Sequence, residues 1–277
     1  MSKFWGPLHE VDMAAGFLRK GYSIVYFSGE LPRAEVKARI MSNLLEISVD
    51  QIKKGTDNAT LEQAEQLDSY GHLEVVDFSL ADTGVFRGCL DQLAAQDNFA
   101  PNVIFIDQLN NCLPTGAVSA SDYARDERFG YVAQDFHKLA KDYKVPVWTA
   151  CQANRTAGLY SQIGVEHVGE SLKIVQESDT VIGMWRDPLS KPQPETKQKG
   201  DKDAPQAGPV IPEPLLKNAI RMSMVKRREG GDDRVQGFYM EREYMRLTDW
   251  QTLGELGALA VKQKLKENKW KSANHGM

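Results

Sequence analysis

The sequence is poor in cysteine, and the cysteines it has are isolated. Cys89, Cys112 and Cys151 form no CxxC pair, and none of them lies near a histidine at the spacing of metal ligands. This pattern argues against both a disulfide framework and a zinc site. We therefore expect the protein to fold in a reducing compartment, the cytoplasm.

Long hydrophobic runs and a dominant charge are also absent. No apolar stretch approaches the roughly 20 residues of a membrane-spanning helix, and residues 1–7 lack the apolar core of a secretory signal. The 34 Lys and Arg face 38 Asp and Glu, which gives a net charge of −4. The sequence thus predicts a protein that is neither exported nor held in a membrane. Any contact with nucleic acid must come from a local basic patch.

The remaining composition is that of a folded protein. Hydrophobic residues make up 42% and charged residues 26% of the 277 positions, which excludes collagen, coiled coil and wholesale disorder. A chain of this length is most simply one large domain with extensions, or at most two small domains.

Hydrophobic periodicity predicts helices and strands in alternation. Helical spacing of apolar residues covers four segments, 8–18, 33–46, 84–96 and 131–143. Short apolar runs predict strands at 23–28, 73–78, 102–107 and 145–150. Such alternation is typical of a mostly parallel sheet with helices on both faces, so the predicted fold class is α/β.

The second half of the chain contains further strand-like runs. Residues 180–185 and 219–225 are expected to continue the series of strands, and 237–240 with 244–247 are expected to form a closing antiparallel pair. The polar stretch 50–71 has room for a short helix.

Two segments fall outside this pattern. Residues 187–215 hold seven of the twelve prolines in a mixture of Lys, Gln, Glu and Asp, which cannot bury enough apolar surface to order itself. We expect a disordered surface insertion there, within a core that spans residues 1–248. Residues 249–277 are expected to form a helix that ends in a basic stretch.

Polar residues at the ends of predicted strands are the candidates for chemistry, because parallel α/β sheets bind ligands at that edge. Asp107 ends one strand and could hold Mg²⁺ or its water shell, and Glu30 lies just past another and could act as a general base. Gln152 could sense a terminal phosphate, and Lys226 and Arg228 follow a later strand. Each residue alone also fits an ordinary polar loop or a solvated basic turn.

Together these motifs resemble the RecA-type ATPase domain of replicative hexameric helicases, the DnaB family and its phage relatives. Residues 25–32, VYFSGELP, are similar to the family's strand ending in SLEMP, and 103–109, VIFIDQL, to its Walker B strand. The most specific match is VPVWTACQANR at 145–155. Residues 169–173 and 225–230 resemble two further motifs, with some positions changed. The resemblance implies a RecA-like P-loop NTPase core.

The resemblance also implies a role for each of the strand-end residues. Glu30 would activate the attacking water, Asp107 would hold Mg²⁺, and Gln152 would sense the γ-phosphate. Lys226 and Arg228 would reach the nucleotide of a neighbouring subunit. The implied cofactors are ATP and Mg²⁺. The implied assembly is a ring that translocates on single-stranded DNA during replication, in the cytoplasm of a bacterial or phage-infected cell.

Two segments correspond to the loops that line the central DNA channel in this family, 114–128 and 153–169. Their candidates for DNA contact are Arg125, Arg128, Asn154 and Arg155. Acidic residues in the first of these segments dilute its positive charge.

One motif of the family is not found in the sequence. A phosphate-cradling GxxxxGK(S/T) loop should precede the first helix, and residues 1–7 begin about where that loop would end. We therefore expect the first strand and the P-loop to be missing from this chain, so that the phosphate-binding residues are unknown. The sequence leaves open whether this reflects a truncated chain, a split helicase gene or degeneration, and an upstream polypeptide is one possible source of the loop.

Two other functions remain open on this sequence. One is a non-catalytic module that binds nucleic acid or joins a helicase ring without hydrolysing ATP, which the missing P-loop favours. The other is a recombinase-like filament protein on the same fold, although the segment around Gln152 fits the helicase family better.

Overall fold

The structure is a computed structural model that describes seven stretches of the chain and residue 157. The stretches are 6–54, 67–117, 124–154, 163–168, 172–186, 218–228 and 235–249. The predicted insertion at 187–215 and the predicted tail beyond Asp249 lie outside the described residues, and both stay predictions. None of the helices in the described part is long and apolar enough to cross a membrane.

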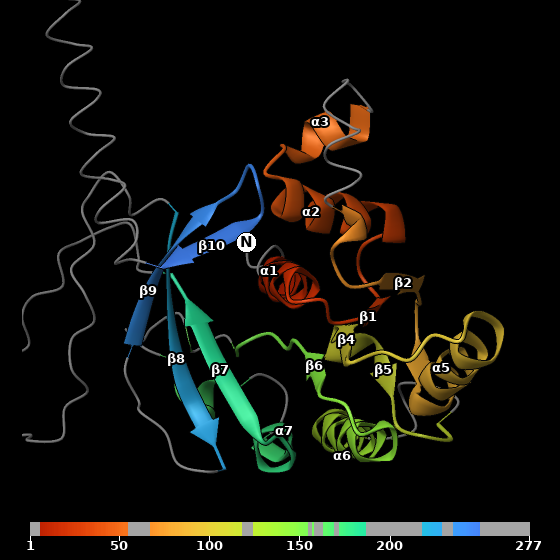
Figure 1. The fold of residues 1–277 in the computed structure, drawn as a ribbon. Coiled ribbons are helices and arrows are strands. Elements are labelled where there is room, and N and C mark those ends of the chain that lie inside the picture. Colours follow the sequence, from red (N-terminus) through yellow and green to blue (C-terminus); the bar gives the residue numbers. More distant parts are fainter. Residues whose placement is uncertain are drawn as a thin grey trace, which may run out of the picture.

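A four-stranded parallel sheet forms the centre of the fold (Figure 1). Its strands, in spatial order, are β2 (Leu73–Asp77), β1 (Ile24–Ser28), β4 (Val103–Asp107) and β6 (Val147–Thr149). Every residue of β1 and β4 is buried, as expected for apolar runs covered on both faces. Ser28 is paired with Asp107, so β1 and β4 end at the same level.

Helices cover both faces of this sheet (Figure 1). One face carries α1 (Gly6–Arg19) and α2 (Arg33–Leu45), and the other carries α5 (Thr83–Asp97) and α6 (Arg125–Tyr143). Because successive side chains of a strand point to opposite faces, β1 contributes to two cores. Tyr26 packs with the α1 and α2 side and Phe27 with the α5 and α6 side. The predicted α/β class is confirmed.

Most predicted helices and strands agree with the structure within a few residues. The exception is α6, which begins at Arg125, six residues before the predicted start. Several short elements complete the fold: α3 (Val49–Lys54), β3 (Ala81–Asp82), η1 (Leu109–Asn111), β5 (Cys112–Leu113), η3 (Val165–His167) and α7 (Leu172–Glu177). The paired strands β3 and β5 have two residues each, too few to show a period in the sequence.

A second sheet is antiparallel throughout, and this corrects the sequence prediction. It consists of β10 (Arg246–Asp249), β9 (Val235–Glu241), β8 (Ala219–Arg227) and β7 (Thr180–Trp185). The expected pair of β9 and β10 is confirmed. The expectation that β7 and β8 continue the parallel series is wrong, because they pair antiparallel with each other. An apolar run indicates that a strand forms, but not the direction of its neighbour.

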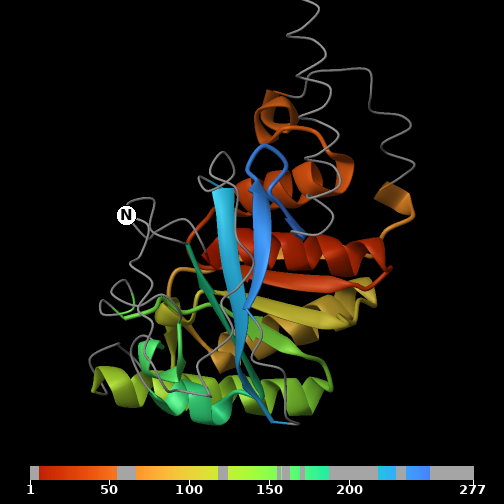
Figure 2. The same cartoon turned by 90° about the vertical axis from the view of Figure 1, so that its left-hand side faces the viewer.

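This second sheet stands across one end of the layered core, from α1 and α2 at one side to α6 and α7 at the other (Figure 2). Ile220 and Met240 pack into the same hydrophobic cluster as α1 and α2. Within the described residues, β6 forms one edge of the parallel sheet and β7 one edge of the antiparallel sheet. The three residues of β6 are only half-buried, unlike those of the neighbouring β4.

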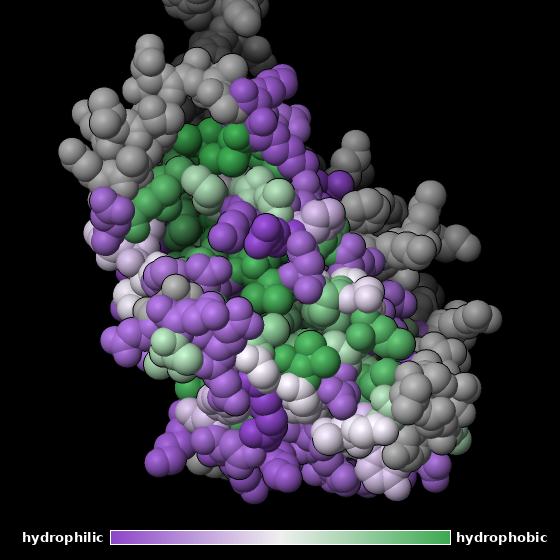
Figure 3. Space-filling view, turned by 90° about the vertical axis from the view of Figure 1, so that its right-hand side faces the viewer, coloured by the Kyte–Doolittle hydropathy of each residue, from purple (hydrophilic) through white to green (hydrophobic). Residues whose placement is uncertain are grey.

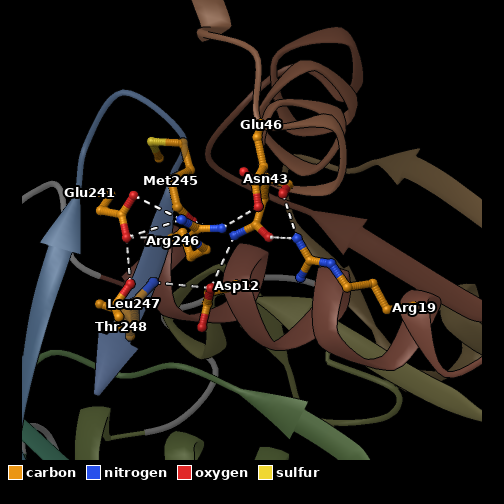
Figure 4. Close-up of polar contacts among 9 residues, drawn as sticks. All are labelled: Asp12, Arg19, Asn43, Glu46, Glu241, Met245, Arg246, Leu247 and Thr248. Atoms are coloured by element: carbon orange, nitrogen blue, oxygen red, sulfur yellow. Dashed lines mark hydrogen bonds and ion pairs between the residues drawn. The ribbon is translucent and has the colours of Figure 1, made fainter. Parts of the chain in front are cut away.

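A buried amide joins the beginning of the chain to its last described strand (Figure 4). Asn43 of α2 is 0% exposed and donates its side-chain amide to the Asp12 carboxylate at 3.0 Å and to the Met245 carbonyl at 2.7 Å. Asp12 in turn accepts the backbone N–H of Leu247 at 3.1 Å. Arg19 donates to the Asn43 side-chain oxygen at 2.8 Å. These bonds fix the β9–β10 hairpin against α1 and α2.

Arg246 extends this connection on the hairpin. Its guanidinium bonds Glu241 of β9 at 3.0 Å and Glu46, the residue that follows α2.

On the side of the molecule away from the antiparallel sheet, apolar surface occurs in patches separated by polar side chains (Figure 3). Two of the exposed large apolar residues, Leu80 and Val85, lie at the entrance to α5.

Candidate functional site

The structure brings Glu30 and Asp107 together at the carboxyl edge of the parallel sheet, as the sequence predicts. Asp107 is the last residue of β4, and Glu30 lies two residues beyond the end of β1. The side-chain amide of Gln108, which follows Asp107, donates to the Glu30 carboxylate at 3.2 Å. The two carboxylates therefore belong to one site.

Gly29 explains how the two loops can approach so closely. Its backbone N–H donates to the carbonyl of Asp107, and its carbonyl accepts the side-chain amide of Asn111 at 2.7 Å. A Cβ atom at position 29 would lie 2.7 Å from the ring of Phe78 and 3.0 Å from the Asp107 carbonyl. The glycine in the segment SGELP is thus a requirement of this packing.

Asp107 is fully buried, and its protonation is shifted. Burial, and then the nearby charge of Glu30, raise the pKa of the Asp107 carboxyl to about 7. The Tyr26 hydroxyl, 3.3 Å away, and the positive charge of Arg39 act in the opposite direction. Arg39 itself bonds Glu35 at 2.9 Å. The Asp107 carboxyl therefore ionises less readily than that of an exposed aspartate.

Glu10 of α1 belongs to the same cluster, and the sequence analysis missed it. The Tyr26 hydroxyl is 3.1 Å from one Glu10 oxygen, and the Glu10 side chain is only 4% exposed. Burial, and then the charge of Asp107, raise the pKa of Glu10 well above its ordinary value. A signal was available, because Glu10 stands at i, i+4 and i+8 with the buried residues Ala14 and Leu18.

The donor set fits a hard divalent cation. One oxygen of Asp107 and one oxygen of Glu10 are buried without a hydrogen-bond partner. Carboxylate oxygens are the ligands that Mg²⁺ prefers, and Mg²⁺ in proteins is often held by only one or two of them. No group of three or more His, Cys, Asp or Glu side chains in the described part of the chain could hold a metal ion. A magnesium site here would therefore rest on few protein ligands.

Gln152 lies at the same edge of the sheet, beyond the end of β6, and its side chain is exposed. The adjoining loop is tied to the sheet, because the backbone N–H of Leu109 donates to the Ala150 carbonyl at 3.1 Å. Asn154 supports its own loop. Its side-chain amide donates to the Glu166 carbonyl at 2.8 Å, and its side-chain oxygen accepts the N–H of Ala157 at 3.1 Å.

Lys226 lies on β8 of the antiparallel sheet and Arg228 directly follows that strand, and both contact α7 or the turn after it. The Lys226 ammonium donates to the carbonyls of the last turn of α7, at 2.9 Å for Gln176. The Arg228 guanidinium forms an ion pair with Asp179 at 2.8 Å, and its backbone N–H donates to the Asp179 carbonyl. In the described structure, neither residue bonds Glu30 or Asp107.

The predicted DNA-contacting arginines have varied surroundings. Arg125 opens α6. Arg128, one turn further on, places its guanidinium 4.5 Å from the centre of the Phe129 ring. Arg155 lies outside the described residues.

Comparison with known proteins places this arrangement in a family. The family model described as the DnaB-like helicase C-terminal domain matches residues 9–249, which include all the strand-end residues discussed above. The chain belongs to this family. Among curated proteins, the DnaB-like replicative helicase of Enterobacteria phage T4 is 25% identical over 182 residues. That match covers 62% of this chain and 38% of the phage protein.

Two solved structures share the fold of this DnaB-like domain, each with a TM-score of 0.65 and 15% identity. The first is a DnaB-like replicative helicase studied for its interactions with primase, and the match covers 87% of this chain and 55% of that one. The second is an ATPase domain, with 88% of this chain and 80% of that one covered. The RecA-like architecture expected from the sequence is thus confirmed.

Proposed function

We propose that this DnaB-like domain is the ATPase motor of a replicative helicase, which couples ATP hydrolysis to translocation on single-stranded DNA. The observation that carries the proposal is the convergence of Glu30 and Asp107 at the carboxyl edge of the parallel sheet, joined through Gln108. Parallel α/β sheets bind their ligands at this edge. The setting would be the cytoplasm of a bacterial or phage-infected cell.

Each carboxylate has a distinct task in this proposal. Glu30, the more accessible one, accepts the proton of the attacking water, and the Gln108 amide keeps its carboxylate oriented. Asp107 holds Mg²⁺ or its water shell, which its unpartnered oxygen supports. The cation would neutralise charge on the phosphates of ATP. Gln152 senses the γ-phosphate from the end of β6.

Lys226 and Arg228 act on the nucleotide of a neighbouring subunit in a ring. A fixed cation stabilises the charge that develops on the transferred phosphoryl group. Their present contacts with the last turn of α7 and with Asp179 place both cations on the side of the molecule that carries the antiparallel sheet. We infer that this side faces the adjacent subunit.

Single-stranded DNA contacts the segments 114–128 and 153–169 in this proposal. Arg125, Arg128 and Arg155 are the candidates for phosphate contact, with Asn154 fixing the shape of the second segment.

A phosphate-binding loop must come from elsewhere for this mechanism to operate, because the sequence contains no GxxxxGK(S/T). Backbone N–H groups and a lysine hold the triphosphate in such loops, and carboxylates cannot replace them. We propose that an upstream segment, either fused to these residues or as a separate polypeptide, supplies the loop and that residues 1–277 alone do not turn over ATP. The test is phosphate release by the chain with and without a polypeptide that carries a strand followed by GxxxxGKS.

A non-catalytic module is the second candidate, and one observation favours it. Burial, and then the charge of Glu30, raise the pKa of Asp107 to about 7, which opposes the ionised form that binds a cation. Such a module would join a helicase ring or bind DNA without hydrolysing ATP. Single-stranded DNA binding that persists while every P-loop polypeptide fails to restore turnover would favour the module.

A further inference from the structure

Three side chains from three different elements meet beneath the carboxyl edge of the parallel sheet. Glu10 comes from α1, Tyr26 from β1 and Asp107 from β4. The Tyr26 hydroxyl lies 3.1 Å from a Glu10 oxygen and 3.3 Å from an Asp107 oxygen. A hydroxyl has one hydrogen, so it can donate to only one of the two carboxylates at a time. The cluster is therefore short of donors.

The other oxygen of each carboxylate has no partner at all. The second oxygens of Glu10 and Asp107 are both buried and unbonded, while Glu10 is 4% and Asp107 0% exposed. Leaving such groups unsatisfied costs folding free energy, and more so for charged ones. A proton on the Glu10 oxygen nearest Tyr26 would complete the chain through the hydroxyl to Asp107. It would still leave both outer oxygens unbonded.

Nearby charged or titratable side chains do not supply what is missing. Among the described residues, neither ring nitrogen of His9, the neighbour of Glu10 in α1, has a hydrogen-bond partner, so this side chain bonds neither carboxylate. The positive charge of Arg39 lowers the pKa of Asp107, but the Arg39 guanidinium forms its ion pair with Glu35. Glu30 adds a further negative charge from the edge of the sheet. A cation that contacts both outer oxygens would satisfy them together.

We propose that Glu10 is a second protein ligand of the divalent cation held by Asp107. The inference rests on the proposed function, because it assumes that Asp107 binds Mg²⁺. It adds a ligand from the first helix to the carboxylate that ends β4. The chemistry suits a hard cation such as Mg²⁺ or Mn²⁺, which takes one or two carboxylates and keeps its remaining positions for water and phosphate. Tyr26 would then donate its hydroxyl hydrogen to one liganding carboxylate at a time and orient it.

The test measures cation binding directly and needs no ATP turnover. The full chain is titrated with Mn²⁺, and free Mn²⁺ is followed by electron paramagnetic resonance, with Mg²⁺ added as competitor. Wild type is compared with Glu10→Gln and Asp107→Asn. The control is Asp91→Asn, because Asp91 also accepts a tyrosine hydroxyl, from Tyr143 at 2.7 Å, but lies on the surface. We expect both site variants to bind Mn²⁺ at least about tenfold more weakly and the control to bind as wild type does.

The outcomes separate this inference from the proposed function. Wild-type Mn²⁺ affinity in Glu10→Gln, with binding lost in Asp107→Asn, would overturn the inference and leave the Asp107 site intact. Wild-type affinity in both variants would contradict the cation site itself. Circular dichroism checks folding. If Glu10→Gln does not fold, Glu10→Asp replaces it, since a carboxylate one methylene shorter should bind Mn²⁺ measurably more weakly, and an unchanged affinity would again overturn the inference.

Discussion

Gln108 connects the two catalytic candidates of the sheet edge, because it follows Asp107 directly and donates its side-chain amide to Glu30 at 3.2 Å. A charged acceptor and a neutral amide make a stronger bond than two neutral groups, so Glu30 is held in one orientation by the loop that carries Asp107. The position of one carboxylate therefore depends on the other's loop.

We expect Glu30→Gln to lower ATP turnover by roughly 10² to 10⁴, the range typical of a lost general base. The substitution keeps the shape of the side chain, so nucleotide binding should persist. Phosphate release and nucleotide affinity are measured in an assembly that includes a P-loop polypeptide. Glu74→Gln is the control, since Glu74 lies on β2 away from this site and contacts His72. Undiminished turnover in the Glu30 variant would remove Glu30 from the proposed mechanism.

The chain by itself should show no appreciable ATP hydrolysis, because its carboxylates repel phosphates in the absence of a phosphate-binding loop. Addition of a polypeptide with a strand and GxxxxGKS should restore turnover. The prediction is wrong if purified residues 1–277 hydrolyse ATP with magnesium and Asp107→Ala abolishes that activity. Such a result would mean that an unrecognised loop holds the phosphates.

Arg228→Ala should reduce turnover about 10³-fold in an assembled ring, as for other arginines that act on a neighbour's nucleotide. Mixing Arg228→Ala subunits with Glu30→Gln subunits tests the sharing of sites. In a random equal mixture, about a quarter of the interfaces pair an intact Glu30 with an intact Arg228, so about a quarter of wild-type activity should return. Failure of any such mixture to recover activity would count against action between subunits.

Acid should destabilise the fold through His9. Burial lowers the pKa of His9 from 6.5 to about 4 in the folded protein. The unfolded chain then binds the proton more readily, so the stabilisation is complete above pH 6.5 and is lost as the pH falls toward 4. The loss should reach about 3 kcal/mol. Because the raised pKa of Asp107 acts in the opposite direction, the effect of His9 is measured relative to wild type. Between pH 7.5 and 4.5, urea unfolding should show His9→Leu gaining about 3 kcal/mol of stability over wild type, whereas the exposed His72→Gln should show no such gain.

Asn43→Ala should destabilise the protein by about 2 to 5 kcal/mol, because it leaves Asp12 and the Met245 carbonyl without their buried donor. Urea unfolding measures the change. Gln92→Ala is a suitable control, since its side chain bonds only Gln96 on the exposed face of α5, and it should stay within about 0.5 kcal/mol of wild type. Equal stability of the two variants would show that the buried amide contributes little.

The hydrophobic pattern of the sequence predicted those helices and strands whose apolar residues recur at a regular local spacing. The apolar runs that end in Ser28 and Asp107 identify buried parallel strands, and the end of each strand locates its polar residue at the common edge. The direction of β7 and β8 depends on pairing between distant segments, which no local period records. Glu10 lies on a helix and carries no strand-end signal, although its spacing from Ala14 and Leu18 places it on the buried face of α1.

The bond between Asn43 and Met245 spans 202 residues of sequence. Contacts of such separation form late, because a long loop must close before they contribute. During synthesis, α1 and α2 leave the ribosome long before their hairpin partner exists, so the part of their apolar surface that packs against Met240 and Met245 stays exposed and can bind chaperones. Nascent chains that stop before residue 245 should therefore remain bound to chaperones, whereas release should follow once the hairpin has been made.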